Sequence, residues 1–274
     1  FNLGGNTMIL RGPNTLDGGA ITLDNVNSLI QVNGACTIDN NLAFTADSNS
    51  NKGLFFNDNV TISGNISMSA DPILDISGTT LTYSGNGFNV GANTLTLTGT
   101  GSFTNSNNIT LDNVNSLIEL AGCTLAKLNQ TSNSNANKGI DVATNASTVT
   151  TFTSAGNSRV DLGANLTITD AFNLGANTMI LSGTSTLSGG AVTLNDVDSL
   201  IQATAACTID NNLTFSADSN SSKGLDLDAN VVISGDITMS ADPIVDFNTN
   251  TILYQWAAVD VGANTLTFLG SGTF

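Results

Sequence analysis

The sequence predicts an all-β fold, a β-solenoid (parallel β-helix) of about 16 short rungs in a single stack. Three observations support this class: a long internal repeat, apolar residues that alternate at period two, and like residues at like corners. The chain has 274 residues, of which 40% are hydrophobic and 10% are charged. This usage differs from that of ordinary globular domains, and the regular apolar pattern argues against disorder.

The internal repeat divides the chain into three copies and the beginning of a fourth. Each copy opens on a motif that reads Phe-Asn-Leu-Gly at residue 1 and returns, with small changes, at 88, 172 and 259. We therefore expect one continuous solenoid segment, 1–274, with copies at 1–87, 88–171, 172–258 and a partial copy at 259–274. Because the first residue already stands at the start of a copy, the chain is interpreted as part of a longer protein.

The strands are predicted from triplets in which two apolar residues flank one outward residue. Cys36–Ile38 and Leu42–Phe44 are examples, and small polar residues separate such triplets. This is the alternation of a strand with one buried face. Five triplet starts in each copy predict a rung of roughly 17 residues and a copy about 24 Å long. In the first copy the starts are Phe1, Ile21, Cys36, Leu54 and Leu74.

The corners between strands carry the same residues in every copy. Sandwiches and propellers need longer strands and hairpin turns, whereas a solenoid needs polar corners that repeat at a fixed step. Like residues at like corners therefore favour the solenoid. The shared corner residues are Gly4, Gly91, Gly175 and Gly262, together with Asn6, Asn93, Asn177 and Asn264.

The style of these repeats is similar to that of a known group of proteins. Runs such as Gly91-Ala92-Asn93-Thr94-Leu95-Thr96-Leu97-Thr98-Gly99 resemble secreted bacterial β-solenoid proteins. This group includes autotransporter passengers, filamentous-haemagglutinin-like adhesins and surface-array proteins. The resemblance covers the whole chain, implies a location at the cell surface or outside the cell and a structural or adhesive role, and transfers no functional residue.

The charge of the chain excludes several classes of partner. The net charge is −16, with 22 acidic residues, six basic residues and no histidine. Such a surface repels phosphate backbones and anionic lipid, so we expect neither nucleic acid nor membrane binding. No apolar run is long enough for a membrane span.

The best candidate for a metal site is a polar corner found in two copies. Asp47, Asn49 and Asn51 alternate before a glycine, as do Asp218, Asn220 and Ser222. Alternating side-chain oxygens followed by glycine resemble the first half of a calcium loop, although the closing glutamate is absent. A lysine lies inside each loop, and the equivalent loop of the middle copy begins with Asn133 in place of aspartate. A polar corner without a metal is therefore the favoured interpretation, and calcium is the one cofactor to test.

The three cysteines occupy one repeat position, at Cys36, Cys123 and Cys207. With five rungs between them, they would be about 24 Å apart, too far for a disulfide, which needs Cα atoms within about 7 Å. We expect them to be reduced, buried and slow to react.

Catalysis is not expected from the residues present. Enzymes on parallel β-helices use carboxylates clustered with Arg, Lys or His, but Arg11 and Arg159 occupy non-equivalent positions here. Asp75, Asp161 and Asp246 recur at one repeat position, which is typical of a solvated ladder. A catalytic pair would instead need a cleft in which two carboxyl groups have different environments.

Two weaker features concern binding. Six threonines are predicted to face outward, and ladders of outward threonine suggest ice binding as a function to consider. They are Thr22, Thr37, Thr110, Thr124, Thr193 and Thr208. The same predicted column also holds Asn2, Phe55, Asp75 and Asn89, so an unbroken array is not expected and strand propensity explains the threonines. Trp256 replaces a small residue at a corner, and is either a partner contact or a filler of the core.

The sequence thus favours a non-catalytic rod segment of an extracellular bacterial filament, sheath or adhesin. Such a rod would self-associate end to end or continue in a longer repeat chain, with cell-surface or glycan ligands as further partners. The alternative is a carbohydrate-binding or polysaccharide-degrading β-helix. A cleft with an aromatic platform and paired carboxylates in a single rung would indicate that alternative.

Overall fold

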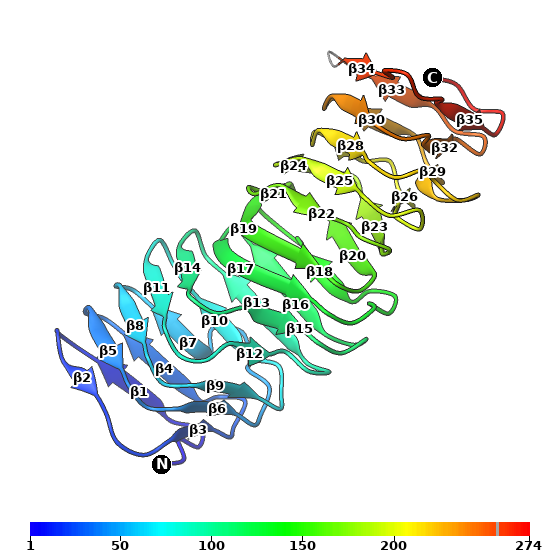
Figure 1. The fold of residues 1–274 in the computed structure, drawn as a ribbon. Helices are drawn as coiled ribbons and strands as arrows, with labels where there is room; N and C mark the ends of the chain where they lie inside the picture. The colour runs from blue at the N-terminus through cyan, green and yellow to red at the C-terminus, as the bar shows by residue number, and fades with distance from the viewer. Residues whose placement is uncertain (256–257) are drawn as a thin grey trace.

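The computed structural model describes residues 1–255 and 258–274, which form an all-β solenoid (Figure 1). These residues contain no helix, and their 35 strands pair in parallel to build about 12 turns along one axis. The predicted fold class is confirmed. The described part of the chain has no helix that is long and apolar enough to span a membrane.

The strands lie on three faces, here called sheet 1, sheet 2 and the third face, and most turns contribute one strand to each. In two turns the long strands β17 (Thr124–Gln130) and β19 (Ser147–Ser154) run through both sheet 2 and the third face. Sheet 1 runs through the whole stack as β1 (Thr7–Leu10), β4 (Leu29–Val32), β7 (Gly53–Phe56), β10 (Ile73–Asp75), β13 (Thr94–Thr98), β16 (Leu117–Ala121), β18 (Gly139–Asp141), β20 (Ser158–Leu162), β23 (Thr178–Gly183), β26 (Leu200–Ala203), β29 (Gly224–Leu227), β32 (Ile244–Asp246) and β35 (Thr267–Leu269).

Sheet 2 lies beside sheet 1 and follows the same order along the axis. It comprises β2 (Thr15–Leu16), β5 (Cys36–Ile38), β8 (Val60–Ile62), β11 (Thr80–Tyr83), β14 (Ser102–Asn105), β17 (Thr124–Gln130), β19 (Ser147–Ser154), β21 (Leu166–Ile168), β24 (Thr186–Gly189), β27 (Thr208–Ile209), β30 (Val231–Ile233) and β33 (Ile252–Tyr254).

The third face is divided into two separate sheets and a middle part. Its strands are β3 (Ile21–Leu23), β6 (Leu42–Phe44), β9 (Ile66–Met68), β12 (Phe88–Asn89), β15 (Ile109–Leu111), β22 (Phe172–Asn173), β25 (Val192–Leu194), β28 (Leu213–Phe215), β31 (Ile237–Met239) and β34 (Val259–Asp260). The two separate sheets are β3-β6-β9 and β22-β25-β28-β31-β34, and in the middle part β12 and β15 join sheet 2 through β17.

The predicted count of 16 rungs of roughly 17 residues is wrong, because one copy contains four turns. Strands β1, β4, β7 and β10 precede β13, which opens the second copy. Thr7 pairs with Leu29, and Leu29 pairs with Gly53, so a turn takes about 22 residues. Every face carries the apolar triplet, so a series of triplet starts combines strands of different faces and does not count turns. At about 4.8 Å per turn, a copy is about 19 Å long.

A single hydrophobic core fills the interior of the stack. In a three-residue strand such as β3, the first and third side chains are buried and the central one points outward. The large side chains of Phe44, Phe56, Tyr83 and Phe103 are almost completely buried. Because each turn packs only on its neighbours, this core grows by the addition of equivalent turns.

The shared corners have the same geometry in all four places, as predicted. The glycine of each corner has a positive φ, between 57° at Gly4 and 64° at Gly91. Two residues later, the asparagine amide donates to the carbonyl oxygen three residues before it, which satisfies a polar group at the bend. The Nδ2–O distances are 2.9 Å for Asn6, 2.9 Å for Asn93, 2.8 Å for Asn177 and 3.0 Å for Asn264.

Close stacking of corners predicts the outcome of one substitution. A Cβ atom added to Gly64 would overlap the backbone of Asn40 in the preceding turn, whereas at Gly19 it would meet open space. We expect Gly64→Ala to lower the free energy of unfolding by roughly 1–3 kcal/mol, the cost of overpacking, and Gly19→Ala to have little effect. Denaturant titration measures both, and an equal response of the two variants would contradict the close approach.

Candidate functional site

The predicted calcium loop forms the corner between the third face and sheet 1. In the first copy it connects β6 to β7, and Asn51 has a φ of 61°. In the third copy Ser222 has a φ of 65°. Asparagine tolerates this left-handed conformation better than most residues, which accounts for its place in the corner.

The polar side chains of this loop bond to neighbouring turns. Asp47 Oδ1 accepts from the backbone N–H of Asp71 in the following turn at 3.0 Å. Asn49 Nδ2 donates to Asn27 Oδ1 in the preceding turn at 2.9 Å. The two side chains therefore bond in opposite directions along the axis, and each joins the loop to the stack.

The third copy has the same arrangement. Asp218 Oδ1 accepts from the N–H of Asp242 at 2.9 Å, and Asn220 Nδ2 donates to Asp198 Oδ1 at 2.7 Å. Among the residues that the structure describes, no three His, Cys, Asp or Glu side chains gather in a metal-binding group.

The middle copy builds this corner without its first carboxylate. Asn133 Oδ1 accepts from the N–H of Asn157 at 2.8 Å, and Asn135 Nδ2 donates to Asn115 Oδ1 at 2.8 Å. An amide oxygen thus replaces the carboxylate with the same partners. This equivalence supports the interpretation of the loop as a device that stacks turns.

Calcium binding at Asp47, Asn49, Asn51, Asp218, Asn220 and Ser222 stays a prediction to be tested by chelation. A bound ion stabilises the folded state by mass action, so its removal would lower the melting temperature. We expect EDTA to leave the melting temperature unchanged, because these side chains already bond to adjacent turns. Thermal unfolding in EDTA, with and without excess calcium, provides the measurement. A shift of many degrees that calcium restores would establish a metal site.

The three cysteines are free and lie four turns apart, not five. Cys123 and Cys207 are buried, as expected, and burial raises the pKa of each thiol to about 11. Cys36 differs because it is only half-buried and borders an open hollow beside Pro13. Burial raises the pKa of the Cys36 thiol, and the negative charge of Asp58 raises it further by a smaller amount.

This difference in burial predicts an order of thiol reactivity. At pH 8 we expect iodoacetamide to modify Cys36 first and Cys123 and Cys207 slowly, because alkylation requires an accessible thiolate. Peptide mass spectrometry after timed quenching gives the order, and full unfolding should equalise the rates. Faster labelling of Cys123 than of Cys36 would contradict the described core.

The raised pKa values also predict loss of stability in alkali. The folded pKa of about 11 for Cys123 and Cys207 lies above the ordinary value of 9.0. Their contribution to stability is therefore fully present below pH 9 and is lost as the pH rises through 11. Unfolding free energies measured across this range should fall less in the double variant Cys123→Ala/Cys207→Ala than in the parent protein.

A cluster of charged residues on sheet 1 was not predicted from the sequence. Strand register places Glu119 opposite Asp141, and Asp141 opposite Asp161, on successive turns. Lys138 and Arg159 join Asp141 and Asp161 in lining a hollow of about 350 Å³. Asp161 was expected in a solvated ladder with Asp75 and Asp246. Those two residues lie four turns away on either side, because a copy is four turns long.

This charged hollow is a feature of the middle copy. The position of Arg159 is taken by Ile73 in the first copy and by Ile244 in the third, and that of Asp141 by Phe55 and Asp226. Burial raises the pKa of Asp141, and the nearby carboxylates of Asp161 and Glu119 raise it further. Within the described residues, Arg159 Nε is buried without a hydrogen-bond partner. A carboxylate column beside guanidinium and ammonium groups can bind polar or charged ligands.

Trp256, the predicted contact residue, lies outside the described residues. Neither the families of known proteins, nor the curated proteins, nor the solved structures compared with this chain gave a match.

Proposed function

We propose that the chain is a non-catalytic rod segment of an extracellular bacterial filament, sheath or adhesin. The observation that carries this proposal is that the polar residues repeated in every copy hold the corners of the stack and join adjacent turns. Asn6, Asn93, Asn177 and Asn264 make the same corner bond in all four places. A catalytic site needs its residues once, whereas a rod needs its joints at each step.

A serine joint repeats in the same way. Ser28 Oγ donates to the carbonyl oxygen of Gly4 at 2.5 Å, and Ser199 Oγ donates to that of Gly175 at 2.5 Å. Ser116 makes the equivalent bond to Gly91. These serines are buried, so each bond satisfies a polar group inside the stack. Repeated internal joints support a role that depends on stiffness and length.

The proposed rod extends beyond the described turns. Phe268 and Phe274 are 45% and 56% exposed, and their ring centroids lie 5.1 Å apart with the rings tilted by 37°. A further turn would bury these apolar side chains and pair the backbone of β35. We propose that this turn comes either from more of the same chain or from a second subunit, so that the partner is another solenoid.

The proposed location outside the bacterial cell follows from the resemblance to secreted repeat proteins. A net charge of −16 suits a solvated filament, because like-charged rods repel one another sideways and remain soluble.

A second candidate function is carbohydrate binding at the charged hollow of the middle copy. The specific observation is the column of Glu119, Asp141 and Asp161 beside Arg159 and Lys138. A carboxylate can accept hydrogen bonds from sugar hydroxyl groups, and a guanidinium group can donate hydrogen bonds to sugar hydroxyl or carboxylate groups. This candidate is compatible with an adhesive rod, in which the shaft presents one binding site.

Electron microscopy tests the rod. Native material should appear as thin rods with an axial repeat of about 19 Å, or about 38 Å if the two kinds of copy alternate, from four turns of about 4.8 Å. A compact monodisperse particle at all concentrations, with no longer material in the native source, would contradict the proposal.

The second candidate is tested by replacing Arg159 of the middle copy with isoleucine, the residue at the equivalent position of the first and third copies. Arg159→Ile should abolish binding to any glycan that the parent protein retains on a glycan array, because it removes the guanidinium group. Rod formation should not change, since isoleucine occupies the equivalent positions 73 and 244. A matched variant, Arg11→Ile, controls for the loss of one positive charge. Equal binding by the Arg159 and Arg11 variants would exclude the charged hollow.

A further inference from the structure

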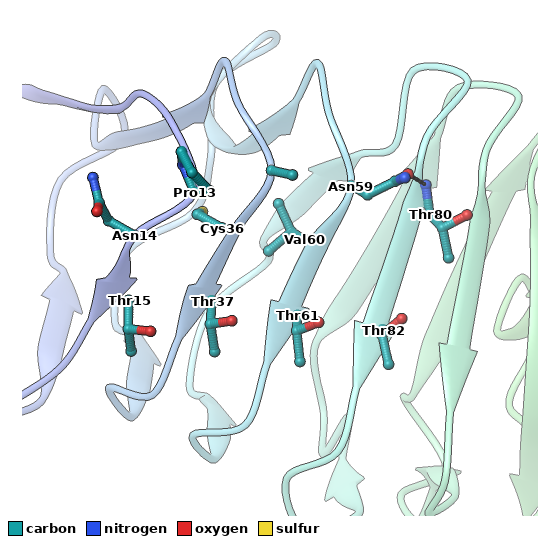
Figure 2. Close-up of a pocket in the computed structure, with 11 residues that line it drawn as sticks. Pro13, Asn14, Thr15, Cys36, Thr37, Asn59, Val60, Thr61, Thr80 and Thr82 are labelled. Atoms are coloured by element: carbon teal, nitrogen blue, oxygen red, sulfur yellow. Dashed lines mark hydrogen bonds between the residues drawn. The ribbon is translucent and has the colours of Figure 1, made fainter.

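Sheet 2 presents hydroxyl side chains in register on its outer surface. Pairing of its strands aligns Thr15 with Thr37, Thr37 with Thr61, Thr61 with Thr82, and Thr82 with Thr104. Figure 2 shows the first four of these threonines as a row across neighbouring strands, each side chain pointing the same way. The strand spacing therefore sets their separation at about 4.8 Å.

A second column continues the array where the first one ends. It lies two residues earlier in the strands, and it overlaps the first column on β11 and β14. Together the columns place a threonine or serine on nine successive strands, from β2 to β24, over about 38 Å. The second column consists of Thr80, Ser102, Thr124, Thr148, Thr167 and Ser188.

This array corrects the column expected from the sequence. Thr22 and Thr110 lie on the third face, and Phe55 and Asp75 lie on sheet 1, so they do not interrupt the threonines of sheet 2. The error arose from the assumed rung of roughly 17 residues, which placed residues of different faces in one column.

Strand propensity alone does not account for the array. Threonine is favoured on any exposed strand surface, so propensity would place it equally on the other faces. On sheet 1 the outward column instead reads Ile9, Gln31, Phe55, Asp75 and Thr98. The longest threonine run on the third face is Thr193, Thr214 and Thr238, between Asn173 and Asp260. The uninterrupted run is thus a property of sheet 2.

The array borders an open hollow of about 520 Å³, and Figure 2 shows the residues that line it. Although the chain carries 22 acidic residues, every residue that lines this hollow is uncharged, and none is aromatic. Small ligands are held in pockets that bury most of their surface, which this open hollow does not do. A flat, extended and neutral partner fits it better.

The hydroxyl groups are available to such a partner. Thr104 donates to the carbonyl oxygen of Leu81 at 3.2 Å and lies 3.3 Å from Thr82 Oγ1, and the hydroxyl groups of Thr167 and Ser188 bond to each other at 3.0 Å. Among the described residues none bonds to the hydroxyl groups of Thr15, Thr37 or Thr61, which are therefore available. A β-branched side chain is stiff at χ1, so oxygen and methyl positions repeat from turn to turn. Water bound to these hydroxyl groups would be ordered at the same period.

We propose that this hydroxyl face of sheet 2 binds an ordered water layer and, through it, the surface of ice. Oxygen atoms along one axis of hexagonal ice repeat at a distance close to the strand spacing, so a rigid parallel stack can match several lattice steps. The methyl groups between the hydroxyl groups favour the same ordered layer, since they are poorly hydrated by disordered water. This activity is independent of the proposed rod role.

Ice-affinity partitioning tests the proposal with the purified chain. Slowly grown ice should enrich the parent protein, and the double variant Thr37→Lys/Thr61→Lys should lose this enrichment because two long charged side chains interrupt the row of hydroxyl groups. The matched control is Thr193→Lys/Thr214→Lys, which also changes two half-buried threonines paired on adjacent turns. It should remain enriched. Circular dichroism and melting temperature verify that both variants fold.

Three outcomes would overturn the proposal. The parent protein could be excluded from ice like an ordinary soluble protein. Both double variants could lose enrichment equally, so that sheet 2 has no special role. The parent could be excluded from ice but bind crystalline cellulose, and only Thr37→Lys/Thr61→Lys could lose that binding. This result would show that the face recognises a polysaccharide surface instead of ice.

Discussion

Parallel pairing of each turn with the turns above and below is the constraint on which the rest of the molecule depends. Strands in such a sheet lie about 4.8 Å apart, so every corner must pass its neighbours at the same distance. At Gly64 this leaves no space for a side chain next to the backbone of Asn40. The shared corner glycines repeat for a second reason, because each has a positive φ that favours glycine.

The same constraint determines how polar groups are used. Asp47 and Asn49 bond to opposite neighbours along the axis, and Asn133 replaces the carboxylate of Asp47 without changing the pattern. Their shared role is to supply hydrogen-bond partners for the backbone and side-chain polar groups of a corner. Metal-like spacing in a solenoid corner is therefore weak support for a metal, since stacking alone requires polar residues there.

The outer surfaces are less constrained than the core and corners, and they differ from face to face. Sheet 1 carries a mixed column that becomes acidic around Asp141, beside Arg159. Sheet 2 carries an uncharged run of threonine and serine, which gives way to Val232 and Leu253 toward the C-terminal end. Because backbone pairing leaves outward side chains free, one scaffold can present different chemistry on adjacent faces.

The sequence by itself determined the fold class and the corner residues. Apolar alternation and exact corner identities are local patterns, so Gly4, Asn6 and the triplet Leu42–Phe44 indicate their roles without any knowledge of neighbours. It did not determine the number of residues in a turn, because triplets of the same apolar pattern occupy all three faces. Only the tertiary structure decided that Thr37 adjoins Thr61 and that Asp141 adjoins Asp161. These contacts depend on the pairing register between turns, and a sequence pattern that is the same on each face carries no information about that register.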